Sequence, residues 1–134
     1  IRIIDDSDSF GDGELEFDLK VNNDVFTDVY VNADMATGTD LTNLSITRTA
    51  TNTANPLTIR VQGLDDDCDV SLCTGGGYPS FDSGSNSDYD WATASTSALP
   101  LPASDGSGTW SAKTTANPLK IEVSGTWKVT YKAL

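Results

Sequence analysis

The chain is predicted to be all-β, a single antiparallel β-sandwich of about seven to nine strands with acidic loops at one rim. Three observations support this fold class. Apolar residues recur with a period of two, no segment shows the spacing of an amphipathic helix, and clusters of turn residues separate the alternating runs. The 134 residues are enough for one domain with its own core, so residues 1–134 are expected to form a single domain.

The first clear strand is predicted over residues 14–21. Its apolar residues alternate with Glu14, Glu16, Asp18 and Lys20, a pattern typical of an antiparallel sheet with one buried face and one wet face. Residues 22–24, Asn-Asn-Asp, predict a turn, and residues 25–33 predict the returning strand. Another strand is expected over residues 39–47, with Leu44 and Ile46 facing inward.

The middle of the chain has one clear strand and one long segment without periodicity. Leu57, Ile59 and Val61 alternate with polar residues and predict a strand, and a short strand is expected to start at Val70 and Leu72. Residues 74–108 are interpreted as a long loop-rich insertion within the domain. It is either a functional loop or a segment that contains short strands near residues 89–94 and 97–101.

Alternation returns toward the end of the chain. One run contains Trp110 and Ala112, the next covers residues 119–123, and the last covers residues 127–131; Trp110 and Trp127 are expected in the core. Residues 53–63 and 115–125 agree at eight of eleven positions, at an offset of 62. In each copy Asn-Pro is predicted to enter a strand and Gly to end it. The similarity indicates either an ancient duplication or convergence on one strand-entry pattern.

Acidic residues are concentrated in two segments that border predicted strands. The first acidic segment, residues 5–14, has five carboxylates in ten residues, and the second, residues 65–69, has four in five. Carboxylates this close repel one another unless a cation or solvent relieves them, and oxygen ligands on loops are what calcium sites use. The alternative is two separate solvated turns. The predicted calcium ligands are Asp6, Asp8, Asp12, Glu14, Asp65, Asp67 and Asp69.

Two parts of the sequence resemble the C2 family of calcium-binding β-sandwiches. They are Asp6, Asp8 and Asp12 ahead of the strand over residues 14–21, and the strand over residues 57–64 that runs into the second acidic segment. The resemblance covers about a third of the chain and implies that acidic loops at one edge gather calcium ions. The family's Asp-Pro-Tyr segment after the first calcium loop and a basic lipid-binding patch are both missing, so calcium is carried over and lipid binding is not.

Composition narrows the function further. A net charge of −12 argues against nucleic acid as a partner, and the lack of a long apolar stretch argues against membrane insertion. The chain has no His, which removes the commonest general base, so it is expected not to be an enzyme. The start at Ile1 looks like a mature, processed form or an excised domain, and the Thr-, Ser- and Asn-rich composition is typical of a secreted or cell-surface protein. Cys68 and Cys73 are predicted to form a disulfide, with two free thiols as the alternative.

Two functions stay open at this level. The first is a calcium-dependent module that binds carbohydrate or another surface protein; its ligand-binding candidates are Tyr78, Tyr89, Trp91, Asp88 and Asp90. The alternative for Tyr89 and Trp91 is a lid over one end of the core. The second function is a structural subunit of a surface filament or pilus-like assembly, which pairs with another copy of itself by strand addition. Ile1, Ile3 and Ile4 would supply the added strand, or they form an ordinary first strand of the domain.

Overall fold

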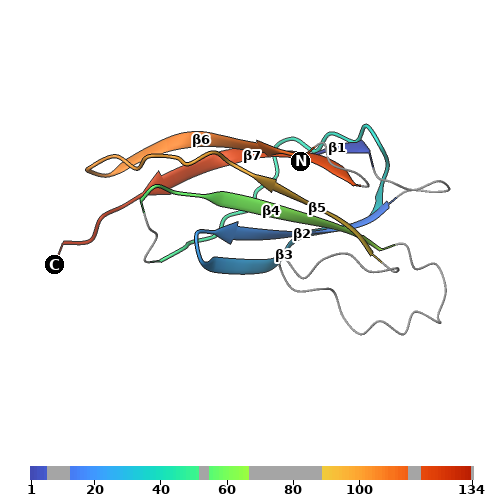
Figure 1. The fold of residues 1–134 in the computed structure, drawn as a ribbon, viewed down its shortest axis with the longest axis horizontal. Helices are drawn as coiled ribbons and strands as arrows, with labels where there is room; N and C mark the ends of the chain where they lie inside the picture. Colours follow the sequence, from blue (N-terminus) through green and yellow to red (C-terminus); the bar gives the residue numbers. More distant parts are fainter. Residues whose placement is uncertain (6–12, 52–54, 67–88, 115–118, 134) are drawn as a thin grey trace.

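The computed structural model describes residues 1–5, 13–51, 55–66, 89–114 and 119–133. All regular elements in these ranges are strands, which confirms the all-β prediction and gives seven strands: β1 (Arg2–Asp5), β2 (Gly13–Val21), β3 (Asp24–Met35), β4 (Ile59–Asp66), β5 (Tyr89–Ser95), β6 (Gly106–Lys113) and β7 (Lys120–Val129). They form two antiparallel sheets, a three-stranded sheet in the order β1-β7-β6 and a four-stranded sheet in the order β3-β2-β4-β5 (Figure 1). The described ranges contain no helix long and apolar enough to cross a bilayer.

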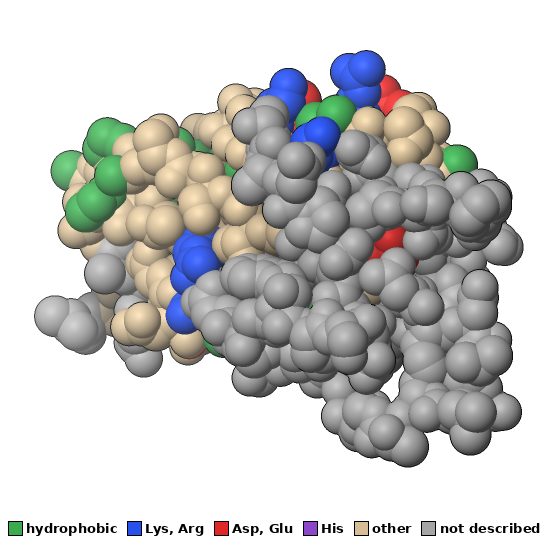
Figure 2. Space-filling view, turned by 45° about the vertical axis from the view of Figure 1, so that its right-hand side comes forward, with side chains coloured by type: hydrophobic (Ala, Val, Ile, Leu, Met, Phe, Trp, Pro, Cys, Tyr) green, Lys and Arg blue, Asp and Glu red, His purple; other side chains and the backbone are tan. Residues whose placement is uncertain are grey.

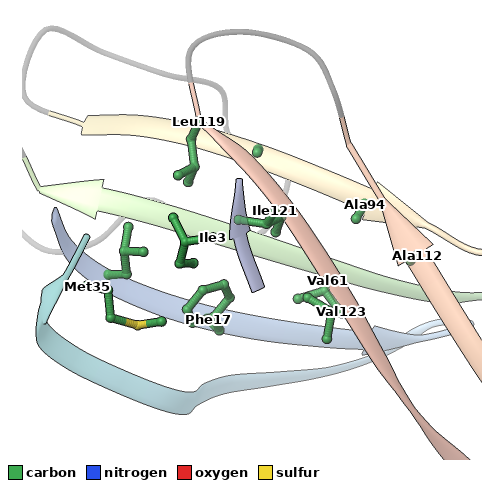
Figure 3. Packing of buried hydrophobic residues seen from close by; sticks show 11 residues of the cluster. Ile3, Phe17, Met35, Val61, Ala94, Ala112, Leu119, Ile121 and Val123 are labelled. Atoms are coloured by element: carbon green, nitrogen blue, oxygen red, sulfur yellow. The ribbon is translucent and has the colours of Figure 1, made fainter. Parts of the chain in front are cut away.

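One buried cluster joins side chains from both sheets. Ile3 and Ile121 come from the three-stranded sheet and Phe17 and Val61 from the four-stranded sheet, and Figure 3 shows them packed between the strands. Phe17 and Ile121 are fully buried, as the alternation in their segments predicts. Burying an apolar side chain of this size stabilises a fold by about 1.5–3 kcal/mol. The predicted inward faces of β2 and β4 are therefore confirmed.

The β2–β3 hairpin closes as predicted. Asn22 and Asn23 form its turn, and Val21 pairs with Asp24 on the two sides. Asn22 has a φ of 49°, a left-handed conformation that Asn tolerates better than most residues. Its Oδ1 accepts a hydrogen bond from the Thr58 amide at 2.8 Å, so the side chain also ties the turn to the approach to β4.

The first strand belongs to the domain's own sheet. β1 pairs with β7 on one side. On its other side the amide of Ile3 donates to the carbonyl of Thr39 at 2.9 Å, and Leu41 donates to Ile1 at 2.7 Å. Both edges of β1 are occupied, and Ile3 is fully buried. The structure thus matches the interpretation of Ile1, Ile3 and Ile4 as an ordinary first strand.

The strand expected over residues 39–47 is wrong. Only Asp40 makes a bridge, to Arg2, and Leu44 is exposed instead of facing inward. Leu44 and Ile46 are the only apolar residues at alternating positions of this Thr-rich segment, and they supply too little buried surface to place a strand in either sheet. The segment instead uses its first residues to cover the edge of β1.

The two strands predicted at residues 119–123 and 127–131 are one strand, β7. Gly125 was expected to end the first of them, but it lies inside β7 opposite Trp110. A methyl group on Gly125 would lie 2.8 Å from Nε1 of Trp110, so the indole occupies the space that the glycine leaves. Gly63 likewise lies inside β4 and does not end it, since Phe17, Leu119 and Ile121 fill the space beside it. The prediction that these two glycines end their strands is therefore wrong: each lies within a strand and makes room for a neighbouring side chain.

The two repeated segments take equivalent places in the fold. The strands that they lead into, β4 and β7, are interior strands of the two different sheets. Their matching apolar residues all face the core, and a methyl group on Gly63 would lie 3.2 Å from Ile121 Cδ1. The repeat thus supplies one core-facing strand to each sheet, an arrangement that both duplication and convergence would produce.

Part of the segment from residue 74 to 108 is regular. Its described portion contains β5 and the first residues of β6, and Leu99 makes an isolated bridge with Leu57. The interpretation with hidden strands therefore holds at residues 89–95, whereas near residues 97–101 there is a bridge and no strand. Val70 and Leu72 lie outside the described residues.

Candidate functional site

The strand register brings the start of β2 and the end of β4, which adjoin the two acidic segments in sequence, to the same end of the four-stranded sheet. β2 begins and β4 ends at this end, because Leu15 pairs with Asp65 in adjacent antiparallel strands. The first acidic segment leads into β2 and the second continues from β4. The flanks are thus arranged as a shared acidic rim requires. Five of the predicted calcium ligands, Asp6, Asp8, Asp12, Asp67 and Asp69, lie outside the described residues.

Two of the sequence candidates occupy paired positions in neighbouring strands. Asp65 in β4 and Asp90 in β5 are direct register partners, and Asp65 is fully buried on the core side beside Leu15. Glu14 lies in β2 and Tyr89 and Trp91 lie in β5, as strand residues. Tyr78, Asp88, Cys68 and Cys73 lie outside the described residues.

A cluster of three carboxylates lies on the other face of the four-stranded sheet. Glu16, Asp18 and Asp28, here called the carboxylate trio, each place one oxygen within 4.8 Å of the other two. Glu16 is 3% exposed and Asp18 is 2% exposed, whereas Asp28 is exposed. The prediction that Glu16 and Asp18 lie on a wet face of β2 is therefore wrong.

A bulge in β3 brings Asp28 to the trio. Phe17 pairs with Tyr30 and Leu19 pairs with Phe26, so one residue of β2 opposes three residues of β3. Asp28, in the middle of the three, has a φ of 52° and donates its amide to Oδ1 of Asp18 at 2.9 Å. Bulges of this kind redirect a side chain and are common beside functional sites.

The trio changes the protonation of its members. Burial is the largest cause that raises the pKa of Glu16 to about 8, and a hydrogen bond with the Asp28 side chain and the charges of Asp28 and Asp18 add to it. Burial also raises the pKa of Asp18, although the amide of Asp28 acts in the opposite direction. At neutral pH the trio therefore holds a proton on Glu16, because burial penalises its charged form and the two neighbouring carboxylates add to that penalty.

The buried polar character continues across the sheet. Asp18 pairs with Gln62 of β4, and Gln62 pairs with Thr93 of β5. Gln62 is 1% exposed, and Oγ1 of Thr93 is buried without a hydrogen-bond partner among the described residues. Polar groups are seldom buried in a row without a role or a partner.

One signal in the sequence would have pointed to this site. Asp28 stands between Phe26 and Tyr30, at a position where strict alternation requires a core-facing residue. A carboxylate there indicates that the strand shifts its register. Which neighbours the shifted Asp28 would meet depends on the pairing of β3 with β2, which a local pattern does not contain.

No family model matches the chain, and neither the curated proteins nor the solved structures contain a match. The chemistry of the site is therefore argued from its own residues. Three carboxylates offer hard oxygen ligands with no nitrogen or sulfur among them, a set that suits Ca²⁺ or Mg²⁺ and not zinc. The trio can hold a shared proton or such a cation.

Proposed function

We propose that the chain is a non-catalytic, secreted or cell-surface β-sandwich that binds calcium and serves as a binding module for carbohydrate or another surface protein. The observation that carries the calcium part is the carboxylate trio. Two nearly solvent-free carboxylates beside a third keep a proton at neutral pH, and a divalent cation neutralises the same charge more completely.

The donor set of the trio fits calcium. Glu16, Asp18 and Asp28 supply from three to six oxygens, depending on how many act through both oxygens, and calcium takes six to eight. Backbone carbonyls or water would supply the rest. The acidic rim, where Asp65 and Asp90 are in register and the two acidic segments adjoin β2 and β4 in sequence, is the second place proposed for calcium.

Calcium binding is tested by thermal melting of the EGTA-treated chain with added CaCl₂. A ligand present at a hundred times its Kd stabilises the native state by about 2.7 kcal/mol, which is several degrees of Tm for a domain of this size. The double variant E16Q/D18N is expected to lose the response if the trio binds calcium. The exposed-site variant D40N, which also removes a carboxylate charge, is the control and should respond as the wild type does.

A second pair of variants separates the two places. D67N/D69N removes carboxylates from the second acidic segment only, and E16Q/D18N removes them from the trio only. Loss of the response in either pair assigns the calcium to that place. A Tm that does not move at millimolar Ca²⁺ in the wild type contradicts the proposal as a whole.

The other function considered, a filament subunit joined by strand addition, has to use an edge other than β1. Residues 38–41 and β7 occupy both sides of that strand. β3, β5 and β6 are the remaining outer strands of the two sheets. No observation in the described part of the chain favours one of them as a donor, so the binding module is the function that we carry forward.

A further inference from the structure

An open groove lies between the segment that follows β5 and the middle of β6 and β7. Its volume is about 590 Å³, within the range of small-molecule sites. The residues that line it follow β5 or lie in the middle of β6 and β7: Thr96, Ser97, Leu99, Thr109, Trp110, Ser111, Ser124, Gly125 and Thr126. β5 runs from Tyr89, paired with Asp66, to Ser95, paired with Arg60, so the segment after it follows the end of β5 opposite Asp66.

None of the described residues that line the groove has an ionisable side chain, although the chain as a whole has a net charge of −12. Six of the nine residues are Ser or Thr, and Trp110 is the single aromatic residue among them. Figure 2 shows hydrophobic side chains gathered at the upper left of the molecule. A neutral surface on a strongly acidic molecule disfavours anionic ligands and offers a cation no partner.

The indole of Trp110 is held in place by the strand beside it. It is half-buried, packs against the core cluster, and covers Gly125, its register partner. A methyl group at Gly125 would lie 2.8 Å from Nε1 and 3.0 Å from Cε2 of this ring. An aromatic ring that is already fixed loses little conformational freedom when a ligand stacks on it.

The same hairpin contains a matched second pair. Trp127 covers Gly108 in the same way, with a methyl group at Gly108 placed 2.7 Å from Cε2 of the indole. Trp127 is also half-buried, but it does not line the groove. The two tryptophans therefore share their local packing and differ in access to the groove.

We propose that this groove binds a neutral saccharide, with the indole of Trp110 as the surface on which a sugar ring stacks. A pyranose has an apolar C–H face and a rim of hydroxyl groups. The indole matches the face, while the hydroxyl groups of Thr96 and Ser97 and the backbone of the edge strand β6 offer hydrogen-bonding groups for the rim. The inference rests on the proposed function as a carbohydrate-binding module, and it assigns the sugar to a site that does not contain the carboxylate trio or the rim.

The test is a titration of the full chain with uncharged oligosaccharides of glucose, galactose, mannose and N-acetylglucosamine, followed by calorimetry and tryptophan fluorescence in EGTA. Binding by at least one of them is expected without calcium. W110A should weaken it roughly tenfold or more, and W127A should change it by less than about threefold. W110F keeps an aromatic ring packed against the core, so it should weaken binding less than W110A. It also controls for the possibility that W110A loses binding because the chain does not fold.

A second variant pair repeats the comparison without removing an aromatic ring. G125A displaces the Trp110 indole and should weaken saccharide binding, whereas G108A displaces Trp127 and should not. Absence of binding by every oligosaccharide, an equal effect of W110A and W127A, or binding of an extended peptide in place of sugar overturns the groove proposal.

The dependence of saccharide binding on calcium distinguishes failure of the groove proposal from failure of the proposed calcium site. Saccharide binding that disappears in EGTA and in E16Q/D18N overturns the groove site but supports a calcium-dependent module. A calcium response without any saccharide binding refutes the groove alone. Saccharide binding in EGTA by a chain whose Tm does not respond to calcium supports the groove and refutes the calcium site.

Discussion

Replacing Glu16 by Gln tests the physics of the carboxylate trio directly. In the folded chain Glu16 is 3% exposed and its pKa is raised to about 8, from 4.5 as the ordinary value. Between these two pH values the folded state keeps a proton that the unfolded state releases. Stability therefore falls as the pH rises through this window, because the folded state binds more protons than the unfolded state does.

The size of the effect follows from the two pKa values. Each pH unit in the window lowers the free energy of unfolding by about 1.4 kcal/mol, so at pH 7 the penalty is about 3 kcal/mol relative to pH 4.5. Gln cannot ionise in either state, and its amide can still donate to Asp28. E16Q is therefore expected to be more stable than the wild type at pH 7, by an amount of this order, and to show a much shallower pH dependence.

The assay is urea unfolding at pH 5, 6, 7 and 8 in EGTA. The control is E122Q, because Glu122 is a partly exposed carboxylate in β7 that lies 3.8 Å from Lys113, and such surface pairs contribute about 0–1 kcal/mol. The reasoning is refuted if the wild type is equally stable across the window, or if E16Q is destabilised at pH 7 and keeps the wild-type slope.

Two further predictions concern packing and the β2–β3 turn. G63A should destabilise the fold by about 1–3 kcal/mol, since the new methyl group would lie 3.2 Å from both Phe17 Cε1 and Ile121 Cδ1; a thermal melt of G63A/I121V should show less than the sum of the two single losses, and simple additivity would contradict the contact. N22A should cost about 1–2 kcal/mol in urea unfolding, because it removes the acceptor for the Thr58 amide and puts Ala, which tolerates the left-handed region less well than Asn, at a φ of 49°. N22G loses the same acceptor but also removes the β-carbon that strains this conformation, so it should be the milder change, and the opposite order would show that backbone strain is not involved.

The strands with long alternation were predictable because their information is local. β2 alternates without interruption and is followed by two asparagines, one of which takes the left-handed conformation that the turn requires. The residues around Leu44 had the same period but only two apolar members. A short pattern of this kind is satisfied equally well by a segment that covers the edge of β1.

The prediction that Gly63 and Gly125 end strands is wrong because the role of these glycines depends on contacts between residues distant in sequence. Gly63 and Gly125 look like strand ends because glycine weakens a strand and leaves a gap in its face. In the fold the gaps are filled by residues distant in sequence, Ile121 beside Gly63 and Trp110 over Gly125. The space beside each glycine is filled because β6 pairs with β7 and the two sheets pack together. Neither feature can be predicted from the alternation of residues within one segment.

The acidic site was predictable in kind but not in place. Counting carboxylates directs attention to the two dense segments, and the register of β2 with β4 does bring their flanks together. The trio instead combines two ordinary members of an alternating strand with Asp28 from a bulge. The trio depends on a register shift between β2 and β3, so its three carboxylates are not close together in the sequence and do not stand out as an acidic segment.

A proton and a calcium ion compete for the trio, and their competition distinguishes a structural cluster from a metal site. A bound cation favours the ionised form of Glu16 and so lowers its pKa toward the ordinary range. Without calcium the free energy of unfolding should decline between pH 4.5 and 8, and with saturating calcium the decline should be reduced or reversed, because binding releases the proton that caused it. A decline of the same slope with and without calcium, in a chain whose Tm nevertheless rises with calcium, would place the ion elsewhere and leave the trio as a group of carboxylates joined by a proton.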